Sequence, residues 1–191
     1  MRVLITGASS GIGRDLAREF AKRKYDIVLV ARNIEKLESI KKELIDEYEV
    51  NAEYLSIDLS NREKCIELHD KAKDIDILVN NAGLGDFGNF SKTELEKDFS
   101  IIDTNITAMH ILTKLYLKDM KEKNSGKILN VASIAGFLPG PLMATYYASK
   151  NYVVRLSEAI REELRKEKSN VKLSILCPGP VRTNFNNVAN V

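Results

Sequence analysis

Short apolar runs alternate along the chain with longer segments in which apolar residues recur every three or four positions. The short runs are rich in Val, Ile and Leu at successive positions, which predicts strands buried on both faces. These strands are expected at residues 3–6, 27–31, 52–57, 75–80, 127–132 and 171–177. The longer segments carry charge on one side and predict amphipathic helices. The helices are expected at about 12–24, 34–48, 61–73, 92–123 with a break near 103–105, and 145–168.

The regular alternation of strand and helix has a consequence for topology. Strands joined through helices pair in parallel, and the helices then cover both faces of the sheet. Right-handed crossovers give a doubly wound, Rossmann-like α/β fold, in which ligands bind at the carboxyl ends of the strands. Because the 191 residues contain no internal repeat or linker-like stretch, we expect a single domain over residues 1–191.

Charge and hydropathy exclude two classes of partner. The 29 Lys and Arg residues nearly balance the 27 Asp and Glu residues, and the two signs are interleaved, so a nucleic-acid partner is not expected. No apolar run approaches the roughly 20 residues of a membrane span, and the N-terminus leads into the first strand without a signal segment. We therefore expect a cytoplasmic protein without a membrane partner.

The chain contains few sulfur and imidazole groups that could build a metal site or a disulfide framework. Cys65 and Cys177 cannot form such a framework, and His69 and His110 lack the spacing of metal ligands. All four are expected to be packing residues, and no metal site is predicted.

A glycine-rich segment follows the first predicted strand and opens the first predicted helix. It reads Thr6-Gly7-Ala8-Ser9-Ser10-Gly11-Ile12-Gly13. Glycines here allow a tight turn and let backbone N–H groups approach an anion, whose charge the helix N-terminus favours. This context favours a pyrophosphate site over an ordinary glycine-containing turn. The spacing G-x-x-x-G-x-G departs from the G-x-G-x-x-G dinucleotide fingerprint.

Three further motifs accompany this spacing along the chain. They are Asn80-Asn81-Ala82-Gly83, Tyr146-x-x-x-Lys150 and Pro178-Gly179-Pro180-Val181-Arg182-Thr183. With the glycine motif, they resemble the short-chain dehydrogenase/reductase family in order, from Val3 to about Thr183. Because Ser10 breaks the G-x-x-G-x-x-G spacing of the extended branch, the shorter oxidoreductase branch fits better. The resemblance implies hydride transfer between a nicotinamide dinucleotide and a small-molecule alcohol or carbonyl substrate.

The resemblance implies cofactor contacts at the carboxyl ends of several strands. Asp58 and the Leu59 backbone would contact the adenine, although Asp58 has the alternative role of a helix N-cap. In the last motif, Pro178 and Gly179 would line the nicotinamide, or the motif is only a proline-rich turn. The implied contacts are Gly7, Ser9, Ser10, Gly11, Ile12, Gly13, Arg32, Asp58, Leu59, Asn81, Ala82, Gly83, Tyr146, Lys150, Pro178, Gly179, Val181 and Thr183.

Two of these motifs have specific expected contacts. The Val181 backbone would meet the nicotinamide carboxamide, and Thr183 would reach the pyrophosphate. The asparagines of Asn80-Asn81-Ala82-Gly83 would tie adjacent strand ends together while Gly83 leaves room for the cofactor, or the motif is a plain turn.

The end of the second predicted strand distinguishes the two nicotinamide cofactors. Ala31, Arg32 and Asn33 follow Val30, and no carboxylate occurs before Glu35. Arg32 would meet the 2′-phosphate of NADP(H) with an opposite charge, a contact worth about 1.5–3 kcal/mol. NADP(H) is therefore the preferred cofactor and NAD(H) the second choice. The alternative is that Arg32 is an ordinary surface arginine.

Proton-transfer chemistry is expected at Tyr146 and Lys150, which are four residues apart and so one turn apart on one helix face. By resemblance, Tyr146 delivers or removes the proton, Lys150 lowers the phenol pKa and binds the nicotinamide ribose, and Ser133 hydrogen-bonds the substrate oxygen. An ammonium about 5 Å from the phenol supplies roughly 3 kcal/mol toward that lower pKa. A turn hydroxyl is the alternative role for Ser133, which follows the fifth strand.

Asn105 interrupts an apolar stripe in the segment 92–123 and should face inward. A buried amide needs hydrogen-bond partners. The resemblance gives Asn105 a catalytic role in holding a water that relays protons toward the lysine, and a purely structural kink is the alternative.

Two apolar segments are relevant to substrate binding and to oligomerisation. The apolar loop 137–143 could line a pocket for an apolar substrate, pack beneath itself or contact a partner subunit. Ile106, Met109, Ile111 and Tyr116 lie outside the apolar stripe, so this helix is expected to pack against the sheet and a neighbour in a homodimer or homotetramer.

Two functions from different classes follow. The first is an NADP-dependent oxidoreductase with Tyr146 as acid/base, and the second is a non-catalytic dinucleotide-binding sensor or scaffold. Compared with the family, the chain stops soon after Thr183, so a C-terminal strand and a substrate-covering lid are expected to be missing.

Overall fold

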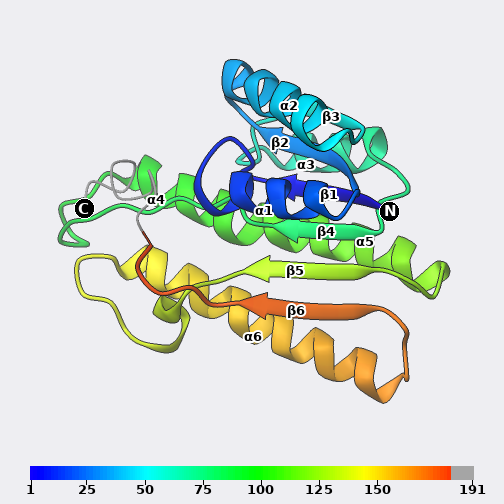
Figure 1. Cartoon of the computed structure of the whole chain (residues 1–191). Helices are drawn as coiled ribbons and strands as arrows, with labels where there is room; N and C mark the ends of the chain where they lie inside the picture. The colour runs from blue at the N-terminus through cyan, green and yellow to red at the C-terminus, as the bar shows by residue number, and fades with distance from the viewer. Residues whose placement is uncertain (182–191) are drawn as a thin grey trace.

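Strands and helices alternate through residues 1–181, the part of the chain that the computed structural model describes (Figure 1). Every expected element is present, with ends within three residues of the prediction. The strands are β1 (Arg2–Thr6), β2 (Asp26–Ala31), β3 (Ala52–Ser56), β4 (Ile77–Asn80), β5 (Lys127–Val131) and β6 (Lys172–Leu176). The α-helices are α1 (Gly11–Lys22), α2 (Ile34–Tyr48), α3 (Arg62–Lys71), α4 (Leu95–Ile102), α5 (Met109–Glu122) and α6 (Ala144–Lys166).

The six strands form one parallel sheet in the order β3-β2-β1-β4-β5-β6. The chain runs outward from β1 to β3, returns to the middle at β4 and then runs outward again, so the strand order reverses between β1 and β4. This confirms the doubly wound fold. A crevice at the carboxyl ends of β1 and β4 is the place where such sheets bind ligands.

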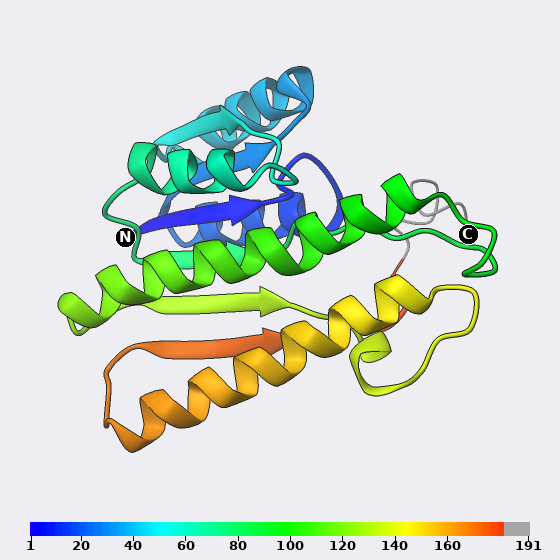
Figure 2. The same cartoon turned by 180° about the vertical axis from the view of Figure 1, so that it is seen from behind.

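Helices cover the two faces of the sheet unequally. One face packs against α1 and α2, and the other packs against α3, α5 and α6, which lie in front of the sheet in Figure 2. The central strands β1, β2 and β4 are almost wholly buried between these layers. They therefore hold the carboxyl ends of the sheet in fixed positions.

The prediction that all six strands are buried on both faces is wrong for β3 and β6. Both are edge strands with half-buried or exposed positions along their length. An edge strand has a neighbour on one side only, and no helix among residues 1–181 covers β6 on the face of α1 and α2. Leu176 is accordingly 37% exposed.

The expected break near 103–105 is a π-helical segment, η1 (Asp103–Ala108), between α4 and α5. It continues the helix but adds an extra residue to the local turn, and such segments often occur at functional sites. Thr104 and Asn105 are buried within it. The segment therefore directs polar side chains from a largely apolar helix toward the carboxyl ends of the sheet.

The helix α5 was expected to pack against the sheet and a neighbouring subunit together. Met109 and Tyr116 are 5% and 1% exposed, so these two side chains pack within the single chain. The Tyr116 hydroxyl donates to the Ala72 carbonyl at 2.9 Å, because α3 packs directly on this side of α5. Ile106 and Ile111 are half-buried.

The cysteines and histidines lie mostly in packing positions. Cys65 is buried and its thiol donates to the Leu59 carbonyl, while Cys177 is half-buried, and both are free. The His69 ring packs edge-on against Tyr116, with ring centroids 4.9 Å apart. Among residues 1–181, no group of His, Cys, Asp and Glu side chains is arranged to hold a metal ion, and no helix is long and apolar enough to cross a membrane.

Candidate active site

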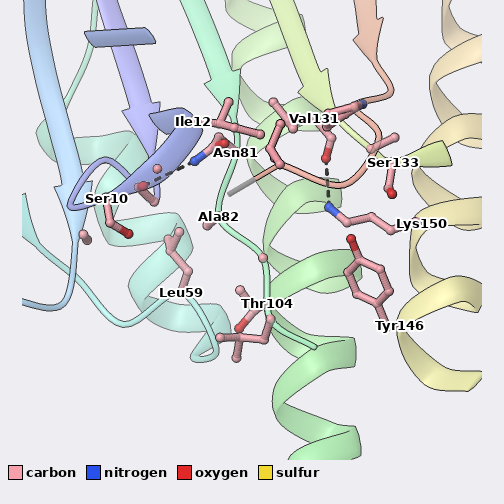
Figure 3. Close-up of a pocket in the computed structure, with 18 of the residues that line it drawn as sticks. Ser10, Ile12, Leu59, Asn81, Ala82, Thr104, Val131, Ser133, Tyr146 and Lys150 are labelled. Atoms are coloured by element: carbon pink, nitrogen blue, oxygen red, sulfur yellow. Dashed lines mark hydrogen bonds between the residues drawn. The ribbon is translucent and has the colours of Figure 1, made fainter. Parts of the chain in front are cut away.

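A cleft of about 520 Å³ lies along the carboxyl ends of the strands. It extends from the glycine-rich loop after β1 to the side chains of Ser133, Tyr146 and Lys150 (Figure 3). Nearly all the expected cofactor residues line it. Gly13 and Asn105 are not part of the lining, and Thr183 lies outside the described residues.

The glycine-rich loop has the shape that an anion site requires. Gly7 and Gly11 have φ angles of +65° and +53°, in the left-handed region that favours glycine. A Cβ atom on Gly13 would lie 2.4 Å from the Gly7 carbonyl oxygen, so glycine is needed there for the helix to start this close to the turn. The first turn of α1 contains no acidic residue, and the side chain of its N-cap Ser10 makes no capping hydrogen bond. The N-terminus of α1 is therefore suited to a negatively charged group such as a pyrophosphate.

Hydrogen bonds connect the glycine loop to the end of β4. Asn81 Nδ2 donates to the carbonyls of Thr6 and Gly7, at 3.0 and 3.3 Å. The Thr6 hydroxyl accepts from the N–H groups of Asn81 and Ala82 at 2.9 and 3.0 Å. The motif after β4 thus ties strand ends together, which favours this interpretation over a plain turn. Thr6 was not among the expected site residues, because a threonine at a strand end has no distinctive spacing.

A buried amide network also supports β4 from beneath. Asn80 Nδ2 donates to Thr113 Oγ1 and to Asn130 Oδ1, each at 2.9 Å, and Asn130 in turn donates to Ser157 at 2.9 Å. These side chains join β4, β5, α5 and α6. The network holds the strand ends that carry both halves of the cleft.

The cleft lining also includes Asp58, Arg32 and Lys36. Asp58 accepts hydrogen bonds from Ser60, through its N–H at 3.0 Å and its hydroxyl at 2.9 Å, and these bonds lower the pKa of the Asp58 carboxyl. The N-cap of α3 is Asn61, so the alternative that Asp58 caps this helix is wrong. Lys36 adds a second cation beside Arg32, which the sequence analysis missed because Lys36 lies one helical turn beyond the strand end.

Ser133, Tyr146 and Lys150 come together at the opposite end of the cleft. Figure 3 shows the three side chains directed into the same region. Ser133 ends the extended segment after β5 and accepts from the Ala135 N–H at 3.1 Å, which fixes its rotamer. Tyr146 and Lys150 lie on consecutive turns of α6, with Lys150 Nζ 5.9 Å from the centroid of the Tyr146 ring.

Burial changes the pKa values of both Tyr146 and Lys150. It raises the pKa of Tyr146, while a hydrogen bond with the Ser133 side chain acts in the opposite direction. The Lys150 ammonium donates to the Val131 carbonyl at 2.9 Å, and burial lowers its pKa to about 8. Lys150 was expected to lower the pKa of Tyr146, but this pKa is raised, with burial of the phenol as the largest cause. Tyr146 therefore holds its proton near neutral pH, as a general acid must.

Asn105 is buried next to the cleft, and both N–H groups of its side-chain amide donate hydrogen bonds. Its Oδ1 accepts from the Leu84 N–H at 2.8 Å, and its Nδ2 donates to the Leu84 carbonyl and the Ser149 hydroxyl, both at 2.9 Å. The Ser149 hydroxyl donates to the Tyr146 carbonyl at 2.7 Å. Asn105 therefore links the loop after β4 to the helix that carries Tyr146.

The loop 137–143 leads from the segment after Ser133 to the start of α6. Phe137, Leu138 and Leu142 are 52%, 62% and 45% exposed, so the expectation that the loop packs beneath itself is wrong for these side chains. Met143 lines the cleft.

A family model described as short chain dehydrogenase matches residues 1–190. The chain belongs to the short chain dehydrogenase family. The expectation of an oxidoreductase of the dehydrogenase/reductase type is thereby confirmed.

Named relatives of this short chain dehydrogenase come from yeast, bacteria and birds. The NADP-dependent 3-hydroxy acid dehydrogenase of Schizosaccharomyces pombe is 37% identical over 190 residues, covering 96% of this chain and 72% of that protein. The 3-oxoacyl-[acyl-carrier-protein] reductase of Rickettsia prowazekii is 32% identical, covering 98% and 75%. Hydroxysteroid dehydrogenase-like protein 1 of Gallus gallus is 36% identical, and the match covers 84% of this chain but only 50% of that protein.

Solved structures show the same fold. A short-chain dehydrogenase from Sphingobium yanoikuyae in complex with NADPH superposes with a TM-score of 0.94 at 34% identity, covering 100% of this chain and 75% of that one. A short chain dehydrogenase/reductase from Burkholderia phymatum in complex with NAD gives a TM-score of 0.93 at 29% identity, covering 100% and 69%.

Proposed function

We propose that this protein transfers a hydride between NADP(H) and an alcohol or carbonyl substrate, with Tyr146 as the acid/base. One observation carries the proposal: Ser133, Tyr146 and Lys150 converge at one end of a cleft that also contains the glycine loop at the N-terminus of α1. The direct test is carbonyl-dependent oxidation of NADPH by the purified chain.

The cofactor, when bound, supplies or accepts the hydride, and the residues of this chain bind, orient and move the proton. Ser133 offers a fixed hydroxyl to the substrate oxygen. Tyr146, which burial keeps protonated, gives its proton to that oxygen as negative charge develops there. The Lys150 ammonium stabilises the resulting phenolate, and its place beside Gly83 suits a contact with the nicotinamide ribose.

Asn105 completes the proposed catalytic set. A Cβ atom on Gly83 would lie 3.5 Å from Asn105 Oδ1 and 3.4 Å from Lys150 Nζ, so the two side chains approach the cleft together. We propose that Asn105 holds the water through which Lys150 is re-protonated from solvent.

The preference for NADP(H) rests on Arg32, supported by Lys36 in the same part of the cleft lining. The Sphingobium yanoikuyae neighbour binds NADPH and the Schizosaccharomyces pombe relative is named for NADP, while the Burkholderia phymatum neighbour binds NAD. NAD(H) is therefore the second choice.

Replacing Arg32 by Ala is expected to weaken NADPH binding by about 10- to 100-fold, because a charge-assisted contact with the 2′-phosphate is lost. NADH affinity should change by less than about 2-fold, since NADH lacks that phosphate. Titration of each cofactor by protein fluorescence measures both constants. Arg23→Ala, at the far end of α1, is the matched control and should leave both unchanged. An equal loss of affinity for both cofactors would show that Arg32 does not recognise the 2′-phosphate.

The two reaction directions are expected to differ in pH dependence. Carbonyl reduction uses protonated Tyr146, whose pKa is raised, so the rate should be flat from about pH 6 to 7. It should fall above about pH 8, where Lys150 loses its charge. Alcohol oxidation uses the phenolate, so its rate should rise about tenfold per pH unit below about pH 8, where Lys150 keeps the charge that stabilises the phenolate. Initial rates in both directions measure this, and parallel pH profiles would contradict the assigned roles.

We also propose a homodimer or homotetramer in the cytoplasm. The support is the apolar surface of α4, where Leu95, Phe99 and Ile102 are exposed although α5 buries its own apolar residues. Light scattering measures the assembly directly.

A further inference from the structure

The lining of the cleft changes in character from one end to the other. Arg32, Lys36 and Asp58 lie at the end assigned to the adenosine part of the cofactor. Around Tyr146 the described lining is apolar or aromatic, apart from short hydroxyl side chains and the Lys150 ammonium. The apolar and aromatic members are Leu84, Ile134, Met143, Tyr147 and Val181.

Lys150 is the one cation in that part of the described lining, and it is already engaged. It is 5% exposed and donates to the Val131 carbonyl at 2.9 Å. A substrate carboxylate or phosphate bound here would lose its hydration without an arginine or a free lysine to replace it. An uncharged substrate bears no such cost.

Tyr147 forms an aromatic wall beside the proton donor. Its ring centroid lies 6.0 Å from that of Tyr146, with the two rings nearly perpendicular at 77°. The Tyr147 ring also lies directly against Gly140, where a Cβ atom would fall 2.2 Å from the ring. The loop 137–143 therefore fixes the position of this ring at the edge of the site.

In the sequence, the loop 137–143 begins shortly after Ile134 and ends at Met143. Both of these residues line the cleft, and the loop between them carries further apolar side chains. Its side chains Phe137, Leu138 and Leu142 are exposed. Leu142 has a φ angle of +65°, which is unfavourable for leucine, and its carbonyl accepts from the Gly88 N–H at 2.8 Å. The loop is thus held at the segment after β4 with its apolar side chains outward.

We propose that this site selects uncharged ketones, and the corresponding alcohols, that carry an aromatic or bulky alicyclic group next to the carbonyl, with Tyr147 as the specificity-determining residue. The proposal rests on the proposed function. Such a group would bury its apolar surface against Tyr147 and Met143 while the carbonyl oxygen meets Ser133 and Tyr146. Among the described lining residues near Tyr146, Lys150 is engaged with the Val131 carbonyl, so we expect acidic substrates to react more slowly than uncharged ones.

The test compares four carbonyl compounds with NADPH: acetophenone, cyclohexyl methyl ketone, acetone and acetoacetate. The kcat/KM for the first two is expected to exceed that for acetone and for acetoacetate by at least about 10-fold. Tyr147→Ala should lower kcat/KM for acetophenone by about 10-fold and that for acetone by less than about 2-fold. Tyr147→Phe keeps the ring and is the matched control, with no change expected. Gly140→Ala, which displaces the ring, should act in the same direction as Tyr147→Ala.

Two results would overturn the proposal. One is a higher kcat/KM for acetoacetate than for acetophenone, and the other is an equal loss for acetone and acetophenone in Tyr147→Ala. If that variant fails to bind NADPH, Tyr147→Leu replaces it, because leucine keeps apolar bulk but removes the flat ring. Failure of the parent chain to oxidise NADPH with any of the four compounds would instead contradict the proposed function itself.

Discussion

Tyr146→Phe is expected to lower the rate of ketone reduction by at least about 100-fold, the smallest factor usual for general acid catalysis. The change removes the proton donor and keeps the ring. Tyr146 is half-buried in the cleft lining, so phenylalanine keeps the shape of the site while the proton beside Ser133 is lost. NADPH affinity should change by less than about 3-fold, since the loss falls on proton transfer rather than on binding. Single-turnover oxidation of NADPH at saturating ketone measures the rate.

A matched control makes this result specific. Tyr152→Phe is the same chemical change on the same helix, and the hydroxyl it removes binds His110 Nδ1 outside the cleft lining. Its rate should stay within about 3-fold of the parent. If Tyr146→Phe were as active as Tyr152→Phe, Tyr146 would not be the residue that transfers the proton.

Gly13→Ala is expected to have the second largest effect, on both folding and cofactor binding. Alanine favours a helix over glycine by up to about 1 kcal/mol, but its Cβ would lie 2.4 Å from the Gly7 carbonyl oxygen. A backbone oxygen cannot rotate away as a side chain can, so the glycine loop or α1 must shift. We expect the free energy of unfolding to fall by about 1–3 kcal/mol and the Kd for NADPH to rise at least about 10-fold. Urea unfolding and fluorescence titration measure the two quantities.

Gly179→Ala is the control for the folding part of this prediction. A Cβ atom there would meet nothing within 4 Å, so the free energy of unfolding should change by less than about 0.5 kcal/mol. If Gly13→Ala were as stable as Gly179→Ala and bound NADPH normally, the close approach of loop and helix would not matter to the site.

Much of this arrangement could be predicted because it depends on spacing along single elements. Tyr146 and Lys150 share a helix face through their separation of four residues, and the glycine motif is recognised by its place between β1 and α1. The inward position of Asn105 followed from its place in an apolar stripe. These features are local, so the sequence alone specifies them.

Features that depend on contacts between distant segments could not be predicted in this way. The role of Thr6 depends on the end of β4, and the position of Tyr147 depends on a loop that returns to α6. The burial of Met109 and Tyr116 depends on the helices and strands that pack around α5. The raised pKa of Tyr146 likewise reflects burial in the folded chain, which the spacing of Tyr146 and Lys150 does not predict.

Turnover measured beside cofactor binding distinguishes an NADPH-dependent enzyme from a protein that only binds the dinucleotide. NADPH binding and ketone-dependent NADPH oxidation are measured on the same preparation of the full chain, with acetophenone, cyclohexyl methyl ketone and acetone as substrates. We expect saturable binding of NADPH, tighter than that of NADH, together with steady oxidation that depends on the ketone. Tight binding of NADPH without turnover on any ketone would contradict this expectation and would indicate a dinucleotide-binding sensor or scaffold instead.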